Sequence, residues 1–180
     1  MADLMEIIKG RRSVRRYQER QIPDADLNTI LEAIRWAPSL ANTQCWEVLV
    51  VRDPAIKQKL QETLSLGNPA TKAMAEAPVV LALSGKLEVS GFYHGQATTK
   101  LGDWLMFDLG IATQNLCLAA CHLNLGTVIV GRFDQDKAKE ILRVPDGYEV
   151  VTLIPLGYPA KEGRAPGRRE LTEFVHYDMF

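Results

Sequence analysis

The twenty residues DWLMFDLGIATQNLCLAACH, from Asp103 to His122, predict a helix that is apolar on nearly every side. One stripe of this helix carries Leu105, Leu109, Ala112, Leu116 and Ala119, and its other faces carry Ile111, Leu118 and Ala120. A helix with apolar residues on all faces has to be covered on most of its surface. In a chain of 180 residues, a second subunit is one possible cover. We therefore expect this helix to be central to the fold and to lie partly at a subunit interface.

Apolar runs of strand length lie on both sides of this helix. We expect strands at Trp46 to Val51, Pro78 to Ser84, Gly126 to Gly131, and Val150 to Leu156. Amphipathic spacing and proline boundaries predict further helices over residues 3–10, from Pro23 and Asp24 to Pro38, from Pro54 onward, over residues 70–77, and from Gln135 to Leu142. Because helices and strands alternate irregularly, the fold class is α+β, in one domain over residues 1–180. Residues 85–102 lack a regular pattern, and the Pro-, Gly- and Arg-rich tail after Gly157 is expected to wrap onto a partner.

The composition excludes several classes of protein. Apolar residues make up 47% and charged residues 24% of the chain, as in an ordinary soluble globular protein. The net charge of -1 argues against a general nucleic-acid binder. No run approaches the roughly 18 apolar residues of a membrane span, and the first residues do not form a secretory signal. Since the three cysteines form no disulfide-framework pattern, we expect a cytoplasmic protein that does not associate with membranes.

Two clusters of arginines stand out against this nearly neutral background. One contains Arg11, Arg12, Arg15 and Arg16, with Ser13 among them, and the other contains Arg164, Arg168 and Arg169. Guanidinium groups offer rigid donors that match phosphate oxygens. The pattern by itself is equally compatible with a phosphate-binding site and with a solvated charged face. The clusters can serve one phosphate only if the fold brings the two ends of the chain together.

The segment PSLANTQCW, from Pro38 to Trp46, places several amide and hydroxyl side chains between a predicted helix and a predicted strand. Amides present both donors and acceptors, which suits the edge of a heteroaromatic ring. The pattern alone favours a simpler reading, a turn in which Ser39 and Asn42 bind nearby backbone groups.

Standard catalytic and cofactor motifs are absent from the sequence. It contains no GxGxxG, GxxxxGK[ST] or GxSxG, and its three histidines are scattered. Cys117 and Cys121 are best explained as buried helix cysteines, so no metal site is predicted. No acid, base or nucleophile emerges either, and we name no catalytic residue. Such an absence is typical of proteins in which a cofactor performs the difficult step.

Five blocks, in this order, resemble the FMN-dependent nitroreductase family. They are RRSVRRY (Arg11 to Tyr17), the Pro38 to Trp46 loop, Ala77-Pro78 with its strand, GIATQNLCLAA (Gly110 to Ala120), and LGYP (Leu156 to Pro159) followed by Arg168 and Arg169. Together they cover nearly the whole chain. The resemblance implies a nitroreductase-like α+β fold with a central, mostly antiparallel sheet flanked by helices. It also implies an intertwined homodimer with two FMN sites, each built from both subunits.

The resemblance assigns roles to particular residues of this chain. Arg11, Arg12, Ser13 and Arg15 match residues that bind the flavin phosphate and ribityl chain, and Arg168 and Arg169 match the C-terminal basic pair of that site. The loop that approaches the flavin from the other subunit is matched by Pro38, Ser39, Asn42 and Gln44. Lys72 and, more loosely, Asn68 match the pyrimidine edge of the ring, where a cation favours the anionic reduced flavin. A segment whose backbone faces the ring is matched by Ile129, Val130 and Gly131. Cys45 stands where the family usually has proline.

The activity implied is a ping-pong transfer of reducing equivalents from NAD(P)H through FMN to a nitroaromatic, quinone or similar electrophilic acceptor. Two alternatives remain open at this point. One is a family relative with a different flavin chemistry, such as reductive dehalogenation or flavin cleavage. The other is a flavin-binding sensor or carrier that does not turn over NAD(P)H.

Overall fold

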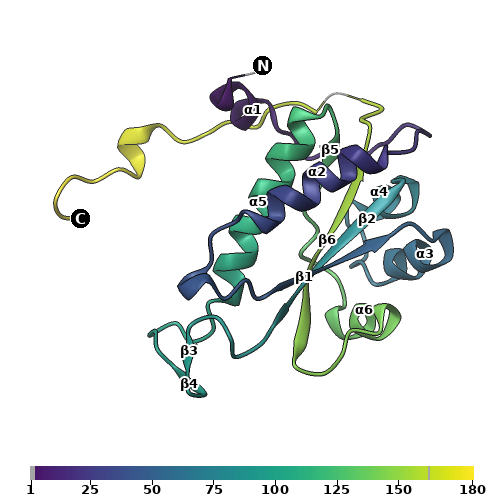
Figure 1. Ribbon diagram of the computed structural model, residues 1–180. Coiled ribbons are helices and arrows are strands. Elements are labelled where there is room, and N and C mark those ends of the chain that lie inside the picture. Colours follow the sequence, from purple (N-terminus) through teal and green to yellow (C-terminus); the bar gives the residue numbers. More distant parts are fainter. Residues whose placement is uncertain (1–2, 162) are drawn as a thin grey trace.

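The computed structural model describes residues 3–161 and 163–180, and its centre is a four-stranded sheet in the order β1-β2-β6-β5 (Figure 1). The strands are β1 (Trp46–Val51), β2 (Val79–Lys86), β5 (Gly126–Thr127) and β6 (Tyr148–Gly157). Each neighbouring pair is antiparallel. The expected α+β class with a mostly antiparallel sheet is thus confirmed.

Helices cover both faces of this sheet. The helices are α1 (Leu4–Gly10), α2 (Asp24–Arg35), α3 (Pro54–Glu62), α4 (Thr71–Glu76), α5 (Leu105–His122) and α6 (Gln135–Leu142). Short 3-10 turns, η1 (Leu40–Asn42) and η2 (Leu171–Glu173), lie in the loop after α2 and in the tail. None of the helices in residues 3–161 and 163–180 is long and apolar enough to span a membrane.

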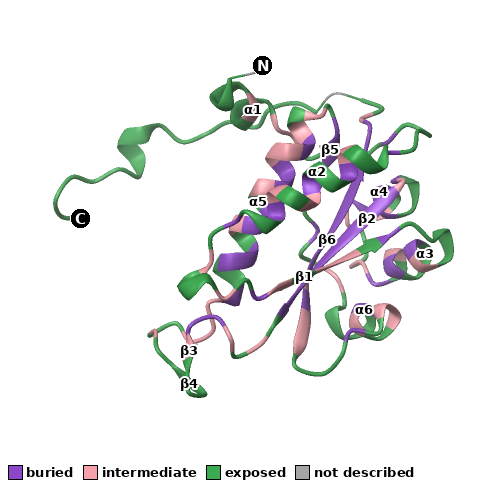
Figure 2. Cartoon of the chain, in the orientation of Figure 1, coloured by how far each residue is buried: buried purple, intermediate pink, exposed green. Residues whose placement is uncertain are grey.

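The sheet separates two hydrophobic cores. Along β2, Val79, Leu81 and Leu83 face the core formed with α2 and α5, whereas Val80 and Ala82 face the core that contains residues of α3, α4 and α6. Side chains of a strand alternate between its two faces, so a strand that is covered on both faces needs a continuous apolar run. This explains why residues 79–83 (VVLAL) are all apolar, and Figure 2 shows β2 and β6 as long, largely buried strands.

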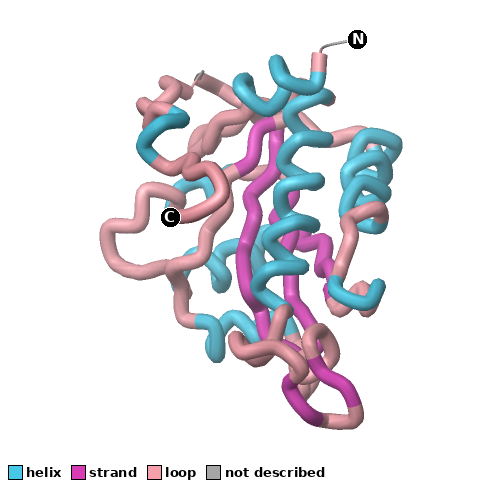
Figure 3. The backbone as a smooth tube through the Cα atoms, turned by 90° about the vertical axis from the view of Figure 1, so that its left-hand side faces the viewer, coloured by secondary structure: helices cyan, strands magenta, loops and turns pink. Residues whose placement is uncertain are grey.

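The central helix α5 lies along one face of the sheet (Figure 3). Its buried residues include Leu105, Leu109, Ala112 and Leu116, four of the five residues of the predicted stripe. At its N-terminal end, a face remains open in the single chain: Met106 is 66% exposed and Phe107 is 59% exposed. The short hairpin of β3 (Phe92–Tyr93) and β4 (Gln96–Ala97) lies in the segment that the sequence left without a pattern.

One predicted strand is much shorter than expected. Residues 126–131 were expected to form a continuous strand, but β5 ends at Thr127, and pairing with β6 returns only at the bridge between Val130 and Leu153. The register in between places Val128 opposite Pro155, which has no N–H to donate. The Pro155 carbonyl instead accepts a hydrogen bond from the Tyr17 hydroxyl at 2.9 Å. The ladder therefore opens at this proline.

Candidate functional site

The two arginine clusters converge on one pocket of about 310 Å³. Its lining combines the N-terminal and C-terminal ends of the chain, namely Arg11, Arg12, Ser13, Arg15, Arg164, Pro166 and Arg168. This set contains five guanidinium groups and one hydroxyl but no carboxylate. The condition that the sequence left open, that the fold must join the two clusters, is met in the structure.

The segment that carries the first cluster is fixed by residues between the arginines. Val14 and Tyr17 are buried, and the backbone N–H of Val14 donates to the Thr127 carbonyl at 2.8 Å. The Tyr17 hydroxyl contacts both the Val14 carbonyl at 2.8 Å and the Pro155 carbonyl. Burial raises the pKa of Tyr17 far above its ordinary value, so this hydroxyl remains a donor. With Val14 and Tyr17 turned inward, the intervening polar residues are left toward solvent.

The second cluster contributes unequally to the pocket. Arg164 and Arg168 line it, and Arg168 also contacts the Pro166 and Gly167 carbonyls at 3.3 and 3.1 Å. Arg169 is directed to the tail instead, where its guanidinium donates to the Glu173 carbonyl and lies 5.6 Å from the centre of the Phe174 ring. In the single chain, the structure thus brings Arg168 but not Arg169 to the first cluster.

The segment Ile129 to Gly131 continues from the arginine-bearing segment. Ser13 forms a parallel bridge with Thr127, two residues before Ile129. Val130 exchanges both backbone hydrogen bonds with Leu153, at 2.9 and 3.1 Å, and is buried. Ile129 and Gly131 on either side are exposed, and a Cβ on Gly131 would meet nothing within 4 Å. The result is an anchored stretch of backbone with open space beside it.

Asn68 and Lys72 lie in the loop and helix that border this stretch. The Asn68 amide donates to the Arg132 carbonyl at 3.1 Å and accepts from the Ala70 N–H at 2.9 Å. It therefore ties the start of α4 to the residue that follows Gly131. Lys72 is exposed on α4, and this helix is joined to the arginine segment by an ion pair between Glu76 and Arg16 at 2.8 Å.

In the single chain, the loop from Pro38 to Gln44 lies at the end of α5 that is away from α1 and the arginine segment after it (Figure 1). Its Leu40 N–H donates to Asp108, near the N-terminal end of α5. Cys121, near the other end of α5, contacts the Ile7 carbonyl just before the arginine segment. At about 1.5 Å of rise per residue, these two positions on α5 are roughly 20 Å apart. Pro38, Ser39, Asn42 and Gln44 are therefore not brought to the arginines by their own chain.

This loop has an unusual backbone. Ala41, Asn42 and Gln44 all have left-handed φ angles, of 52°, 55° and 47°. The Ser39 hydroxyl accepts from the Gln44 N–H at 2.9 Å, which is the Ser39 part of the turn that the sequence favoured. Left-handed backbone is disfavoured in residues with a Cβ and tends to cluster at functional sites.

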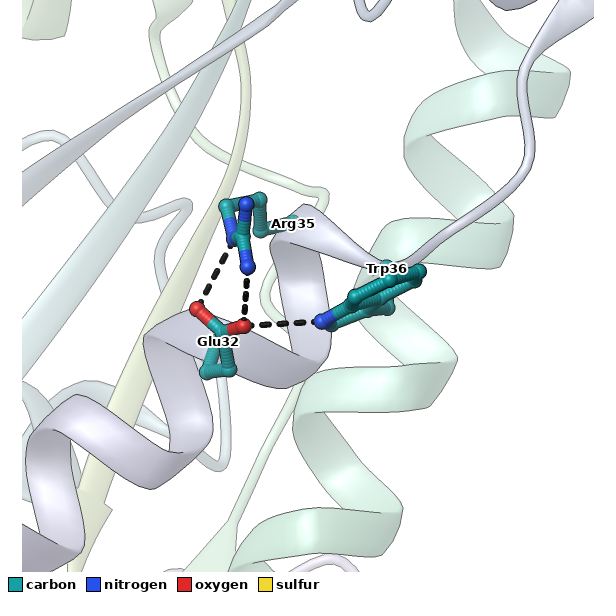
Figure 4. A network of polar contacts seen from close by, with 3 residues as sticks. All are labelled: Glu32, Arg35 and Trp36. Atoms are coloured by element: carbon teal, nitrogen blue, oxygen red, sulfur yellow. Dashed lines mark hydrogen bonds and ion pairs between the residues drawn. The ribbon is translucent and has the colours of Figure 1, made fainter.

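A polar network closes α2 immediately before the loop. The Glu32 carboxylate accepts hydrogen bonds from Arg35 and from the Trp36 indole N–H, the latter at 2.7 Å (Figure 4). These bonds lower the pKa of Glu32, with Arg35 as the main cause. Trp36 is thereby held in one orientation although it is largely exposed.

Of the two cysteines on α5 that were predicted to be buried, only Cys117 is fully so. Cys117 is buried, with its sulfur 3.3 Å from the Thr127 hydroxyl, and Cys121 is partly buried. Burial raises the pKa of both thiols. Among the residues that the structure describes, no group of three potential ligands could hold a metal ion.

Sequence reasoning missed Asp108, which contacts the loop from Pro38 to Gln44, and its partner Ser90. Both are buried, and the Ser90 hydroxyl donates to the Asp108 carboxylate at 2.5 Å. The available signal was an aspartate near the start of the largely apolar central helix, since buried carboxylates are rare unless they have partners.

Comparison with known proteins identifies a family. A family model described as "Nitroreductase family" matches residues 8–76 and 66–158. An NADH dehydrogenase of Thermus thermophilus is 34% identical over 92% of this chain and 91% of its own length. A protein of Bacillus subtilis named FMN reductase [NAD(P)H] is 30% identical over 100% of this chain and 75% of its own length. The crystal structure of a nitroreductase family protein from Clostridium novyi NT superimposes with a TM-score of 0.79 at 27% identity, covering 88% of this chain and 86% of that one.

Proposed function

Because this chain belongs to the nitroreductase family, we propose that it is an FMN-dependent oxidoreductase that works as a homodimer. It takes reducing equivalents from NAD(P)H and delivers them to a nitroaromatic, quinone or similar electrophilic acceptor. The names of the two relatives, an NADH dehydrogenase and an FMN reductase [NAD(P)H], support both the electron donor and the flavin.

The convergence of the two arginine clusters is the observation that carries this proposal. A pocket lined by five guanidinium groups and a serine hydroxyl, without a carboxylate, fits a phosphate dianion. The FMN phosphate is such a group, so the donor set of the chain fits the cofactor. Arg11, Arg12, Ser13, Arg15 and Arg168 would hold it, and Arg164 joins them from the same pocket. Arg169 belongs to the same site only if the tail is rearranged against a partner subunit.

The remaining site residues fit the ring of the cofactor. Ile129, Val130 and Gly131 offer anchored but open backbone next to the arginine pocket, and Lys72 offers a cation from α4. When bound, FMN would supply the redox chemistry that links NAD(P)H to the acceptor. The protein binds and orients the reactants, and no side chain is needed as a general acid because water can supply protons.

A second subunit completes the site. Pro38, Ser39, Asn42 and Gln44 lie at the far end of α5 from the arginines of their own chain, so they reach a flavin only across an interface. The exposed Met106 and Phe107 on α5 provide an apolar face for that interface. The tail provides more apolar surface, since Leu171, Phe174, Tyr177, Met179 and Phe180 are all exposed in the single chain (Figure 2).

A comparison of FMN with riboflavin, which lacks the phosphate, tests the proposed site. Fluorescence titration of the flavin-free protein should show much tighter binding of FMN than of riboflavin. Arg11→Ala should weaken FMN binding by about 1.5–3 kcal/mol, or roughly 10- to 150-fold, through the loss of a charge-assisted contact. The same change should leave riboflavin binding unaltered.

The matched control is Arg52→Ala. Arg52 pairs with Asp24 at 2.5 Å and does not line the arginine pocket, so its loss should leave FMN affinity unchanged. Equal affinity of the wild-type protein for FMN and riboflavin would contradict the assignment of this pocket to the phosphate.

A further inference from the structure

The carboxylate of Asp108 is buried inside the protein without a cationic partner. Asp108 is 1% exposed, and no ion pair involves it among residues 3–161 and 163–180. Its partners are the Ser90 hydroxyl at 2.5 Å, the Leu40 backbone N–H at 3.2 Å and the Cys45 thiol at 3.8 Å. A buried charge is costly unless donors compensate it. Here the donors come from two chain segments that are far apart in the sequence.

One of these segments is the loop from Pro38 to Gln44. Its internal bonds, from the Asn42 N–H to the Ser39 carbonyl and from the Gln44 N–H to the Ser39 hydroxyl, close the loop on itself. They do not fix it to the body of the protein. The bond from Leu40 to Asp108 does so, and Cys45 adds a contact at the end of the loop. Because three of its residues have left-handed backbone, the loop needs such external support to keep this conformation.

The other segment carries the β3–β4 hairpin. Ser90 precedes β3, and its carbonyl accepts from the Trp104 N–H at 2.9 Å. The next residue, Gly91, has a φ of 81°, and its carbonyl accepts from the Thr98 N–H at 2.7 Å. A Cβ on Gly91 would lie 2.9 Å from the Gly102 carbonyl oxygen, so the two ends of the hairpin segment are in close contact here. Ser90 is thus the point at which the base of the hairpin segment meets α5.

We propose that Asp108 is a positioning residue, which holds the Pro38–Gln44 loop in place and couples it, through Ser90, to the hairpin segment. This role rests on the proposed function, in which the loop contacts the flavin of the partner subunit. The loop and the hairpin segment then move as one unit. Loss of the coupling displaces residues that face the ring and the acceptor, while the phosphate contacts remain.

Hydrogen exchange on the flavin-bound protein tests the coupling. Ser90→Ala removes one donor to Asp108 and leaves every residue from 38 to 46 unchanged. We expect amide exchange in residues 38–46 to rise about tenfold in this variant, because the remaining bonds to Asp108 lose their fixed geometry. Asp108→Asn should have the same effect. The matched control is Asp134→Asn, the same substitution at the start of α6, where the Asp134 carboxylate accepts from the Lys137 N–H at 3.0 Å. It should leave exchange in residues 38–46 as in the wild type.

Steady-state kinetics separates positioning from general stability. For Ser90→Ala and Asp108→Asn, the acceptor KM should rise about tenfold with kcat changed less than twofold, and the preference for FMN over riboflavin should persist. If Asp108→Asn does not fold, Ser90→Ala carries the test alone. The positioning role would be overturned if the wild type binds flavin and is active, and if the Ser90→Ala variant has the same exchange at residues 38–46 and the same acceptor KM. A wild type that binds no flavin would instead contradict the proposed function itself.

Discussion

Cys45 shows how one residue is affected by a buried carboxylate. Cys45 lies directly before β1 and is 5% exposed, and its thiol contacts Asp108. Burial and, second, the nearby Asp108 carboxylate raise the pKa of Cys45 to about 11. The thiol therefore stays protonated at neutral pH and is a donor rather than a nucleophile.

This pKa predicts a specific loss of stability in alkali. An unfolded cysteine ionises with a pKa of 9.0, whereas folded Cys45 holds its proton until about 11. Between these values the folded state binds more protons than the unfolded state, so its stability falls as pH rises. Thermal melting from pH 8 to 11 should show a steeper decline for the wild type than for Cys45→Ala. Parallel curves for the two proteins would show that Cys45 ionises normally in the folded state.

Among the elements, β5 and the arginine segment are joined by close packing. A Cβ on Gly126 would lie 2.4 Å from Cγ2 and 2.7 Å from Cβ of Val14, a β-branched side chain with little freedom to move. The glycine is required because the segment that carries Arg12, Ser13 and Arg15 runs directly against the strand. Packing at this position is therefore linked to the placement of the arginines in the proposed phosphate site.

Gly126→Ala should lower stability by about 1–3 kcal/mol through overpacking. It should also weaken FMN binding, because Val14 can yield only by shifting the neighbouring arginines. Urea denaturation and flavin titration measure the two effects. Gly10→Ala is the control, since a Cβ on Gly10 meets nothing within 4 Å. Wild-type FMN affinity in the Gly126→Ala protein would show that packing at β5 does not affect the proposed phosphate site.

Most elements could be predicted from the sequence because their apolar periodicity is local. The run Trp46–Val51 became β1 as expected, and Gln135–Leu142 became α6. The early end of β5 could not be predicted, since it depends on Pro155 lying opposite Val128 in the neighbouring strand. The hairpin of β3 and β4 was missed because each strand has only two residues.

From the residue patterns alone, the site was predictable in parts but not as an assembly, which only the family resemblance implied. Each arginine cluster was visible in the sequence as a group of residues that can bind phosphate. The pattern of the sequence contains nothing that joins Arg11 to Arg168. That union comes from the pairing of Ser13 with Thr127 and the return of the chain after β6. The aspartate on the central helix was a visible signal, but its partners were not predictable, because its donors lie at Leu40 and Ser90.

At the scale of the whole molecule, the single chain leaves apolar surface where the proposed homodimer needs it. Phe107 and its neighbour Met106 are both exposed on α5, near the loop that the proposed homodimer brings to a partner's flavin. The exposed apolar residues of the tail have the same explanation. An exposed apolar patch of this kind is typical of an interaction site.

Phe107→Glu should convert the dimer to monomers, because a carboxylate would be buried in the interface without a partner. Sedimentation velocity measures the change, and bound FMN should be lost with it. Leu66→Glu makes the same change at a fully exposed residue outside α5 and the tail, and it should remain dimeric. A Phe107→Glu protein that stays dimeric would place the interface elsewhere.

The visible absorption spectrum of the purified protein, recorded without oxygen before and after addition of NAD(P)H, tests the central claim most directly. The proposed function predicts a flavin spectrum that bleaches on reduction. A flavin spectrum that NAD(P)H leaves unchanged would contradict the oxidoreductase and favour a flavin-binding sensor or carrier. A colourless protein that does not bind added FMN would contradict the flavin site itself.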